Sequence, residues 1–290
     1  MRTALVFPGQ GSQCAGMGVA WTSTPGWSLV GEASAALGRD LSWLLLEADA
    51  EQLRQTREAQ VATFLMSLLA LRALPRLDVT VVAGHSLGEY TALVAAGVLS
   101  ESEGLRLVAE RGEAMQAAAE AAPGTMAAVL GLPAEQVAAA CPDSVWVANL
   151  NAPSHVVVSG AMAPMGGVGD RLKAAGARRV LPLPVGGAFH TPLMAPARDR
   201  LDRALSQAVY AEPTMPILAN VTASPYPLGV AALLSEQLTA PVRWQQTVEA
   251  LDVDRVVEVG PGGVLTGLVK RTRPHLTAVS VTTPADLEAL

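Results

Sequence analysis

Apolar and polar positions along the chain predict short buried strands separated by helices. Two apolar runs, TALVF at 3–7 and VTVVAG at 79–84, read as strands, and each leads into a turn that contains glycine. Helical spacing covers about Trp27 to Leu46, then 50–74, and the small-residue stretch 88–99. Strands that alternate with helices are typical of a doubly wound, mainly parallel sheet, so we expect an α/β fold.

The order of elements changes between 124 and 184. Here the pattern predicts a strand (125–132), a helix (133–141), two strands joined by a turn at 151–153, a helix (168–177) and a strand (178–183). This β-α-β-β-α-β order is that of the ferredoxin-like split arrangement. We therefore predict a small ferredoxin-like α+β subdomain at 124–184, inserted in a large hydrolase-like α/β domain made of 1–123 and 185–290.

The pattern of the large domain resumes after this segment. A helix is expected at 195–208, a strand at 215–221 and a helix at 230–238. From 255 to 271 the chain reads as a strand, a glycine-rich turn and a helix.

Composition narrows the possible functions. The chain has 290 residues, of which half are apolar, and a formal net charge of −6, which argues against nucleic-acid partners because they require clustered Lys and Arg. No stretch reaches the roughly 18 apolar residues of a membrane span, and nothing resembles a signal peptide, so we expect a cytoplasmic protein. Cys14 and Cys141 lie far apart and predict neither a disulfide nor a zinc site; we expect both to be reduced and buried.

The motif GHSLG at 84–88 fits the G-x-S-x-G pattern of a nucleophile elbow. It stands between an apolar strand and a helix, which is the context that such an elbow needs. There the turn would expose the hydroxyl of Ser86, and the amide of Leu87 at the start of the helix could face an oxyanion. The same pattern also fits an ordinary glycine-lined turn with a capping serine.

A serine nucleophile needs a base, and the chain has four histidines. His85 adjoins the serine in sequence and is expected to point away from it. We interpret His155 as structural, within a strand, and His275 as a solvated residue of a polar segment. His190, in VGGAFHTPLM, follows the last strand of the small subdomain, where a loop could bring it over Ser86, and is the best candidate.

Six segments, in order and over essentially the whole chain, resemble a known family. They are similar to the successive motifs of malonyl-CoA:acyl carrier protein transacylases, which also occur in the acyltransferases of polyketide synthases. The segments are FPGQGSQ (7–13), GHSLGEY (84–90), RGEAMQ (111–116), NLNAPSHVVVSG (149–160), GAFHTPLM (187–194) and EVGPGGVLTGL (258–268).

The resemblance implies a role for each matching residue. Ser86 would be the acylated nucleophile and His190 its base, with the main-chain carbonyl of Gln237 orienting the histidine in place of a triad aspartate. The backbone amides of Gln10 and Leu87 would form the oxyanion hole.

The resemblance also makes Arg111 the partner of the malonyl carboxylate. A guanidinium grips a carboxylate through two parallel hydrogen bonds, so an acyl group without a carboxylate would leave it desolvated and unpaired. From the residues alone, a surface arginine of a helix, paired with Glu110 or Glu113, would be the favoured interpretation of Arg111.

Acyl selectivity is expected to depend on Phe189 and Leu87. In polyketide acyltransferases, phenylalanine and an aliphatic residue at these positions go with malonyl rather than methylmalonyl. We also consider Gln60, Asn149 and Asn151 possible pocket residues.

The chain departs from the family pattern in three places. Val61 stands where the family usually has proline, and Gly263 where many members have lysine. The segment 222–230 looks shorter than usual. These changes bear on carrier docking and on the shape of the entrance.

We thus expect a ping-pong malonyl transfer from coenzyme A to the phosphopantetheine thiol of an acyl carrier protein, by a monomeric enzyme without a metal or other cofactor. An α/β hydrolase is disfavoured because it would normally present its triad acid between the serine and the histidine. A trans-acting polyketide acyltransferase with another extender unit, a malonyl-transfer subunit of a malonate decarboxylase, and an inactive carrier-binding homologue are the alternatives.

Two basic clusters are candidates for docking an acidic carrier. One is Arg178 with Arg179, and the other is Lys270, Arg271 and Arg273. Such clusters more often serve as solvated faces.

Overall fold

The computed structural model describes residues 1–226 and 229–290. Within these residues, the main sheet, sheet A, has five strands that all pair in parallel, in the order β7-β2-β1-β8-β9. The expected mainly parallel α/β sheet is therefore confirmed. Its strands are β1 (Thr3–Phe7), β2 (Val79–Gly84), β7 (Ile217–Leu218), β8 (Arg255–Val259) and β9 (Thr277–Val281).

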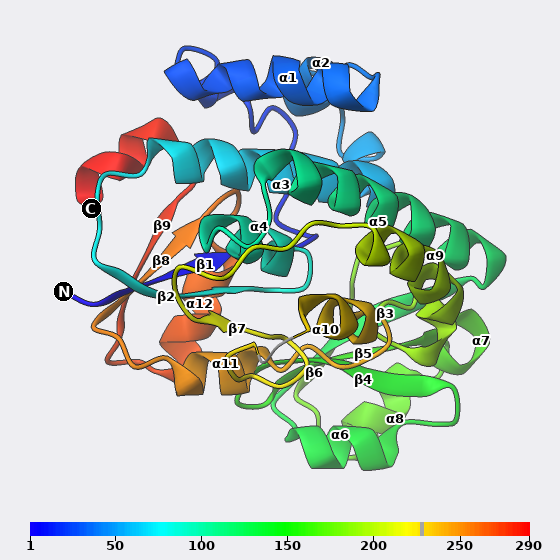
Figure 1. Cartoon of the computed structure of the whole chain (residues 1–290). Helices are drawn as coiled ribbons and strands as arrows, with labels where there is room; N and C mark the ends of the chain where they lie inside the picture. The colour runs from blue at the N-terminus through cyan, green and yellow to red at the C-terminus, as the bar shows by residue number, and fades with distance from the viewer. Residues whose placement is uncertain (227–228) are drawn as a thin grey trace.

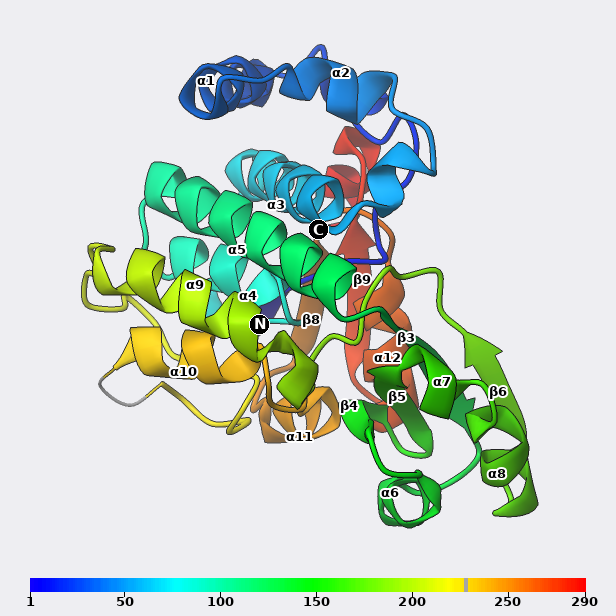
Figure 2. The same cartoon turned by 90° about the vertical axis from the view of Figure 1, so that its right-hand side faces the viewer.

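Both faces of sheet A are buried, as the alternation along β1 shows. Leu5 and Phe7 belong to the larger hydrophobic core, whereas Ala4 and Val6 belong to a second core on the opposite face. Helices cover both faces (Figures 1 and 2). The larger core takes side chains from α1 (Ser28–Leu37), α2 (Leu41–Leu46), α3 (Thr56–Ala73), α4 (Gly88–Ala95), α5 (Glu101–Ala121), α9 (Ala195–Ser206) and α10 (Val230–Gln237), and the second from α11 (Trp244–Ala250) and α12 (Val264–Thr272).

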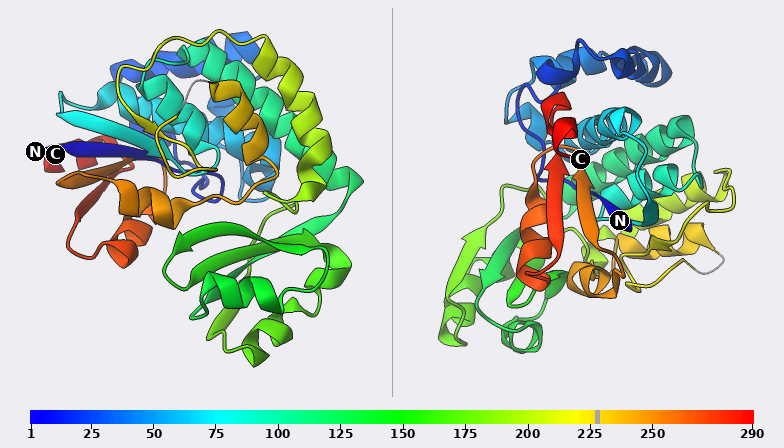
Figure 3. Two further views of the ribbon diagram at one scale, coloured as in Figure 1. Left: turned by 60° about the horizontal axis from the view of Figure 1, so that its bottom comes forward. Right: turned by 90° about the vertical axis from the view of Figure 1, so that its left-hand side faces the viewer.

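The smaller sheet, sheet B, is antiparallel with the order β4-β5-β3-β6. This is the strand order of a split β-α-β-β-α-β unit, as the sequence predicts. One face packs on α6 and α8 in a third core, while the other turns toward the larger core. Figure 3 shows sheet B to one side of sheet A. Its elements are β3 (Gly124–Leu130), α6 (Ala134–Ala140), β4 (Val145–Ala152), β5 (His155–Ala161), α7 (Met162–Met165), α8 (Val168–Ala174) and β6 (Arg179–Pro182).

Some predicted elements differ from the structure. The single helix expected from Trp27 to Leu46 is two helices, because Gly38 adopts φ +63 after α1 and Asp40 caps α2 through the amide of Trp43. The strand expected at 215–221 is only two residues long, and part of the segment 222–230 lies outside the described residues. Short 3₁₀ helices cover Val19–Trp21, Pro25–Trp27, Gln52–Arg54, Pro192–Met194 and Pro284–Ala289.

Two further findings concern the cysteines and the membrane. The expectation that both cysteines are buried is wrong, since Cys14 is exposed and Cys141 half-buried.

Within residues 1–226 and 229–290, no helix has the length and apolar character needed to cross a membrane.

Candidate active site

The GHSLG segment forms a tight turn between β2 and α4, and close contacts require both of its glycines. A Cβ on Gly84 would lie 1.9 Å from the carbonyl carbon of Gly88, and one on Gly88 would lie 2.0 Å from the carbonyl oxygen of Phe7. Ser86, at the apex, has φ +52, a conformation that costs energy for a residue with a side chain. Its hydroxyl therefore sits on a strained strand-to-helix turn, the geometry of a nucleophile elbow.

Asn220 holds this turn through two hydrogen bonds. The sequence analysis did not predict this residue. Its Oδ1 accepts a hydrogen bond from the amide of Ser86 at 2.6 Å, and its Nδ2 donates to the carbonyl of Gly84 at 2.6 Å. Asn220 lies just beyond β7, which pairs with β2. The available signal was a polar residue at the carboxyl end of an apolar strand, where sites in parallel sheets gather.

His190 lies against Ser86, with Nε2 2.8 Å from Oγ. Its Nδ1 lies 2.8 Å from the carbonyl oxygen of Gln237. Because a carbonyl can only accept, Nδ1 carries the hydrogen, and Nε2 is free to accept the proton of the serine. Burial, with the charge of Arg111, lowers the pKa of His190 to about 3, so that the neutral form is present at neutral pH.

Arg111 reaches the same point from α5 and is 1 % exposed. Its Nη2 donates to Ser86 Oγ at 3.1 Å and to Oε1 of Gln237 at 2.9 Å, and its Nη1 donates to Oε1 of Gln60 at 2.7 Å. Burial lowers its pKa from the usual value. Its Nε has no acceptor among the described residues.

The alternative reading of Arg111 as a surface arginine does not fit this arrangement. The neighbouring Glu110 pairs with Arg200, and Glu113 lies 4.0 Å from Arg57. None of the three contacts of Arg111 is a carboxylate. The guanidinium is a buried cation directly beside the serine hydroxyl.

The two amides of the expected oxyanion hole lie at adjacent turns. Leu87 immediately precedes α4, and Gln10 lines the cavity above Ser86. Gly9 lets the two turns approach, since a Cβ there would lie 2.4 Å from the carbonyl oxygen of His85. Within the described part of the chain, neither amide donates to another protein group.

A cavity of about 740 Å³ opens over Ser86 and His190. Met126, Ala128 and Val157 line it from sheet B, on the face opposite α6 and α8. Phe189 lines it beside the histidine. Sheet B is therefore one wall of the site, and the Ser86 turn lies opposite.

The other expected pocket residues divide into two groups. Asn149 and Asn151 line the cavity, and Oδ1 of Asn151 lies 2.9 Å from Nε2 of His85. Gln60 does not line the cavity, but its Oε1 accepts a hydrogen bond from Arg111.

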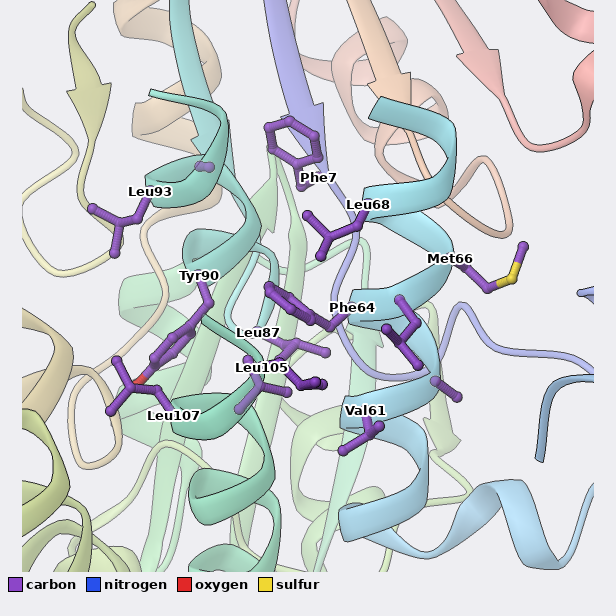
Figure 4. Packing of buried hydrophobic residues seen from close by; sticks show 14 of the residues in the cluster. Phe7, Val61, Phe64, Met66, Leu68, Leu87, Tyr90, Leu93, Leu105 and Leu107 are labelled. Atoms are coloured by element: carbon purple, nitrogen blue, oxygen red, sulfur yellow. The ribbon is translucent and has the colours of Figure 1, made fainter. Parts of the chain in front are cut away.

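The side chain of Leu87 is fully buried in the larger core, near Phe64 and Leu105 (Figure 4). Leu87 is not among the residues that line the cavity, so the structure does not support its expected contact with the acyl group.

The remaining histidines have other partners. His85 packs on Trp244, with ring centroids 5.5 Å apart, and does not contact the Ser86 hydroxyl. His155, interpreted as structural, also lines the cavity, and its Nδ1 lies 3.2 Å from Nη1 of Arg271. His275 is exposed. Among the described residues, no three His, Cys, Asp or Glu side chains are grouped to hold a metal ion.

The positions of His190 and Arg111 around the hydroxyl of Ser86 suit acyl transfer through a serine nucleophile. Residues 4–285 match the family described as acyl transferase domain. The malonyl CoA-acyl carrier protein transacylase of Salmonella typhimurium is 41% identical over 308 residues, covering 99% of this chain and 97% of that protein.

Solved structures agree with this match. An acyl carrier protein S-malonyltransferase from Vibrio cholerae has a TM-score of 0.91 and 40% identity, with 99% of each chain covered. A chain from a complex between a type II polyketide synthase acyl-carrier protein and its malonyl-transacylase has a TM-score of 0.95 and 37% identity, covering 100% of this chain and 98% of that chain. The chain belongs to the acyl transferase family, among the malonyl CoA-acyl carrier protein transacylases.

Proposed function

We propose that the protein transfers a malonyl group from malonyl-CoA to the phosphopantetheine thiol of an acyl carrier protein, for fatty acid or polyketide biosynthesis. The transfer would pass through a malonyl ester of Ser86. The proposal includes a monomeric, cytoplasmic enzyme that uses no metal or other cofactor.

One observation carries this proposal: the guanidinium of Arg111 lies 3.1 Å from the hydroxyl of Ser86. A buried cation at the nucleophile suits an acyl group with its own negative charge. Each charged hydrogen bond is worth about 1.5–3 kcal/mol, so a neutral acyl group forgoes a large part of its binding energy there. The names of the relatives point to the same acyl group.

In the first half of the reaction, the hydroxyl oxygen of Ser86 attacks the thioester carbonyl while its proton passes to Nε2 of His190. The amides of Gln10 and Leu87 hold the resulting oxyanion; loss of one such donor typically costs about 10²–10³ in rate. The carbon–sulfur bond then breaks, and the departing thiolate takes the proton from His190. The product is a malonyl-serine ester whose carboxylate lies on Arg111.

In the second half, the carrier's phosphopantetheine thiol gives its proton to His190 and attacks the ester carbonyl. The same amides hold the oxyanion. The Ser86 oxygen leaves and recovers the proton, which returns the enzyme to its first state.

Phe189 is the residue that we propose to favour malonyl over methylmalonyl. Its ring lines the cavity beside His190, where a branch on the α-carbon would meet it. One methyl group is worth about 1–3 kcal/mol in such pockets, so the preference is graded rather than absolute.

The experiment that tests the function is intact mass spectrometry after brief incubation with malonyl-CoA, methylmalonyl-CoA or acetyl-CoA. We expect a covalent malonyl adduct that forms fastest, a slower methylmalonyl adduct, and discharge of the malonyl adduct by a holo acyl carrier protein. The absence of an adduct with all three thioesters would refute the proposal.

We further propose that the carrier docks over α12. Val264 and Leu268 of this helix line the cavity, and Lys270 and Arg271 are exposed near its end. Arg271 also contacts His155 of the cavity wall. An acidic carrier placed there could direct its thiol arm into the cavity.

Reversing these two charges tests the docking surface. In a Lys270→Glu, Arg271→Glu variant, the apparent KM for the carrier should rise about tenfold, because like charges then face each other. The matched control reverses the exposed pair Arg178 and Arg179. If the control raises the KM and the α12 variant does not, the docking surface lies elsewhere.

A further inference from the structure

Glu89 is a buried carboxylate one turn beyond the proposed nucleophile. It lies on α4 and is 1 % exposed. Its Oε1 accepts hydrogen bonds from the hydroxyl of Tyr226 and from the amide of Asn220, the latter at 3.0 Å. Its Oε2 accepts from the side-chain amide of Gln237. The reaction proposed above assigns no step to this group, although a buried carboxylate is costly.

The contact with Gln237 fixes which way that amide points. Arginine can only donate and an ionised carboxylate can only accept, so Oε1 of Gln237 must face Arg111 and Nε2 must face Glu89. The second hydrogen on Nε2 goes to the carbonyl oxygen of Ser86 at 2.9 Å. The main-chain carbonyl of the same glutamine accepts from His190. One residue thus touches the serine turn, the base and the guanidinium.

Glu89 is also connected to Ser86 through Asn220. Glu89 accepts from the backbone of Asn220, whose side chain holds the amide of Ser86 and the carbonyl of Gly84. Ser86 has a positive φ, which persists only where surrounding contacts enforce it. The carboxylate therefore supports the strained turn from behind, without touching the hydroxyl.

We propose that the ionised carboxylate of Glu89 is a positioning residue for loading of the acyl group: through Gln237 and Asn220 it holds the Ser86 turn, the acceptor of His190 and the Arg111 guanidinium in one arrangement. This inference rests on the proposed function. Glu89 does not touch the substrate and is not a catalytic residue in that sense.

If Glu89 has this role, the rate of malonyl loading should depend on the protonation state of its carboxyl group. Burial raises the pKa of Glu89 to about 7, against the opposing effects of Tyr226, Asn220, Gln237 and the charge of Arg111. The groups that face it are Arg111 from α5, Tyr90 on α4, Tyr226, and the neutral side chain of Gln237. On protonation the carboxyl loses acceptor capacity, and the hold on the neighbouring amides weakens.

The expected result is a rate of malonyl loading that rises as the pH increases through about 7. This rise is the ascending limb of the pH–rate profile. His190 does not cause it, because the pKa of His190 is about 3. The carrier thiol does not supply it either, because loading precedes it. The measurement is the rate of adduct formation from malonyl-CoA between pH 5 and 9, by rapid quench and intact mass.

A Glu89→Gln variant tests the carboxylate itself. Its amide nitrogen would face the amide nitrogen of Gln237, two donors together, so the loading rate should fall about 10- to 100-fold at pH 8. The rise through pH 7 should also disappear. A purely structural role would lower the rate and leave that limb in place.

A second variant keeps the test decisive if Glu89→Gln does not fold. Tyr226→Phe removes one donor to Glu89 and leaves the contacts with Gln237 and Asn220. Since that donor lowers the pKa of Glu89, its loss should move the limb to higher pH, with a near wild-type rate at pH 9.

The outcomes separate this inference from the proposed function. A wild-type protein that forms no malonyl adduct defeats the proposed function. The role of Glu89 is overturned if the wild-type protein forms the adduct at a rate that does not change with pH. It is also overturned if the Glu89→Gln variant keeps the rise in rate through pH 7. If only Tyr226→Phe can be measured, an unmoved limb does the same.

Discussion

Replacing Ser86 with alanine should abolish covalent loading from malonyl-CoA. The hydroxyl is the group that His190 can deprotonate, with Nε2 at 2.8 Å, and the cavity opens directly over the pair. Alanine leaves the base, the amides and Arg111 in place but supplies no oxygen to acylate. Intact mass should show no adduct after incubation long enough to saturate the wild type, and transfer to the carrier should fall by about 10⁶.

Ser67→Ala is the matched control for this change. Ser67 is a fully buried serine on α3 whose hydroxyl has no hydrogen-bond partner among the described residues. Its removal should leave loading intact. A malonyl adduct that persists in Ser86→Ala would place the ester on another residue and end the proposed mechanism.

The sequence predicts the parallel sheet and sheet B well because each has a strong local pattern. The apolar runs of β1 and β2 end in glycine turns, and the strand and helix order of 124–184 is that of a known split arrangement. The helix break at Gly38 was missed because Leu37 and Leu41 continue the apolar pattern across it. A backbone turn of this kind leaves no trace in hydrophobic spacing alone.

The proximity of Ser86, His190 and Arg111 was predictable only in part. GHSLG carries its own structural context, but nothing local to His190 or Arg111 fixes a distance to Ser86, and the family resemblance supplied that link. Asn220 and Glu89 were missed for a physical reason. Each acts through a contact between segments more than a hundred residues apart, which periodicity does not encode.

The side chain of Leu87 is placed differently from what the sequence suggested. The family resemblance made Leu87 a residue of acyl selectivity, which suggested contact between its side chain and the acyl group. In the structure, the side chain of Leu87 packs into the larger core and does not line the cavity (Figure 4). Ser86 and Leu87, although adjacent in sequence, thus have different surroundings: Ser86 lines the cavity, whereas the side chain of Leu87 is buried in the core.

Arg111→Ala should weaken the preference for a charged acyl group. The wild-type guanidinium would hold the malonyl carboxylate by two charged hydrogen bonds, each worth about 1.5–3 kcal/mol. Their loss should lower kcat/KM for malonyl loading by at least about 100-fold. Acetyl loading should fall far less, because acetyl-CoA never makes these bonds, so the ratio of acetyl to malonyl adduct should rise.

Two further variants separate the carboxylate contact from packing and from charge in general. Arg111→Lys keeps one positive charge but not the paired donors, so its malonyl loading should lie between wild type and Arg111→Ala. Arg200→Ala removes a partly exposed arginine that pairs with Glu110, and should leave the acyl preference unchanged. Rates with malonyl-CoA and acetyl-CoA, measured side by side, decide the matter. If Arg111→Ala loses both acyl groups equally, the arginine supports the Ser86 turn and does not recognise the carboxylate.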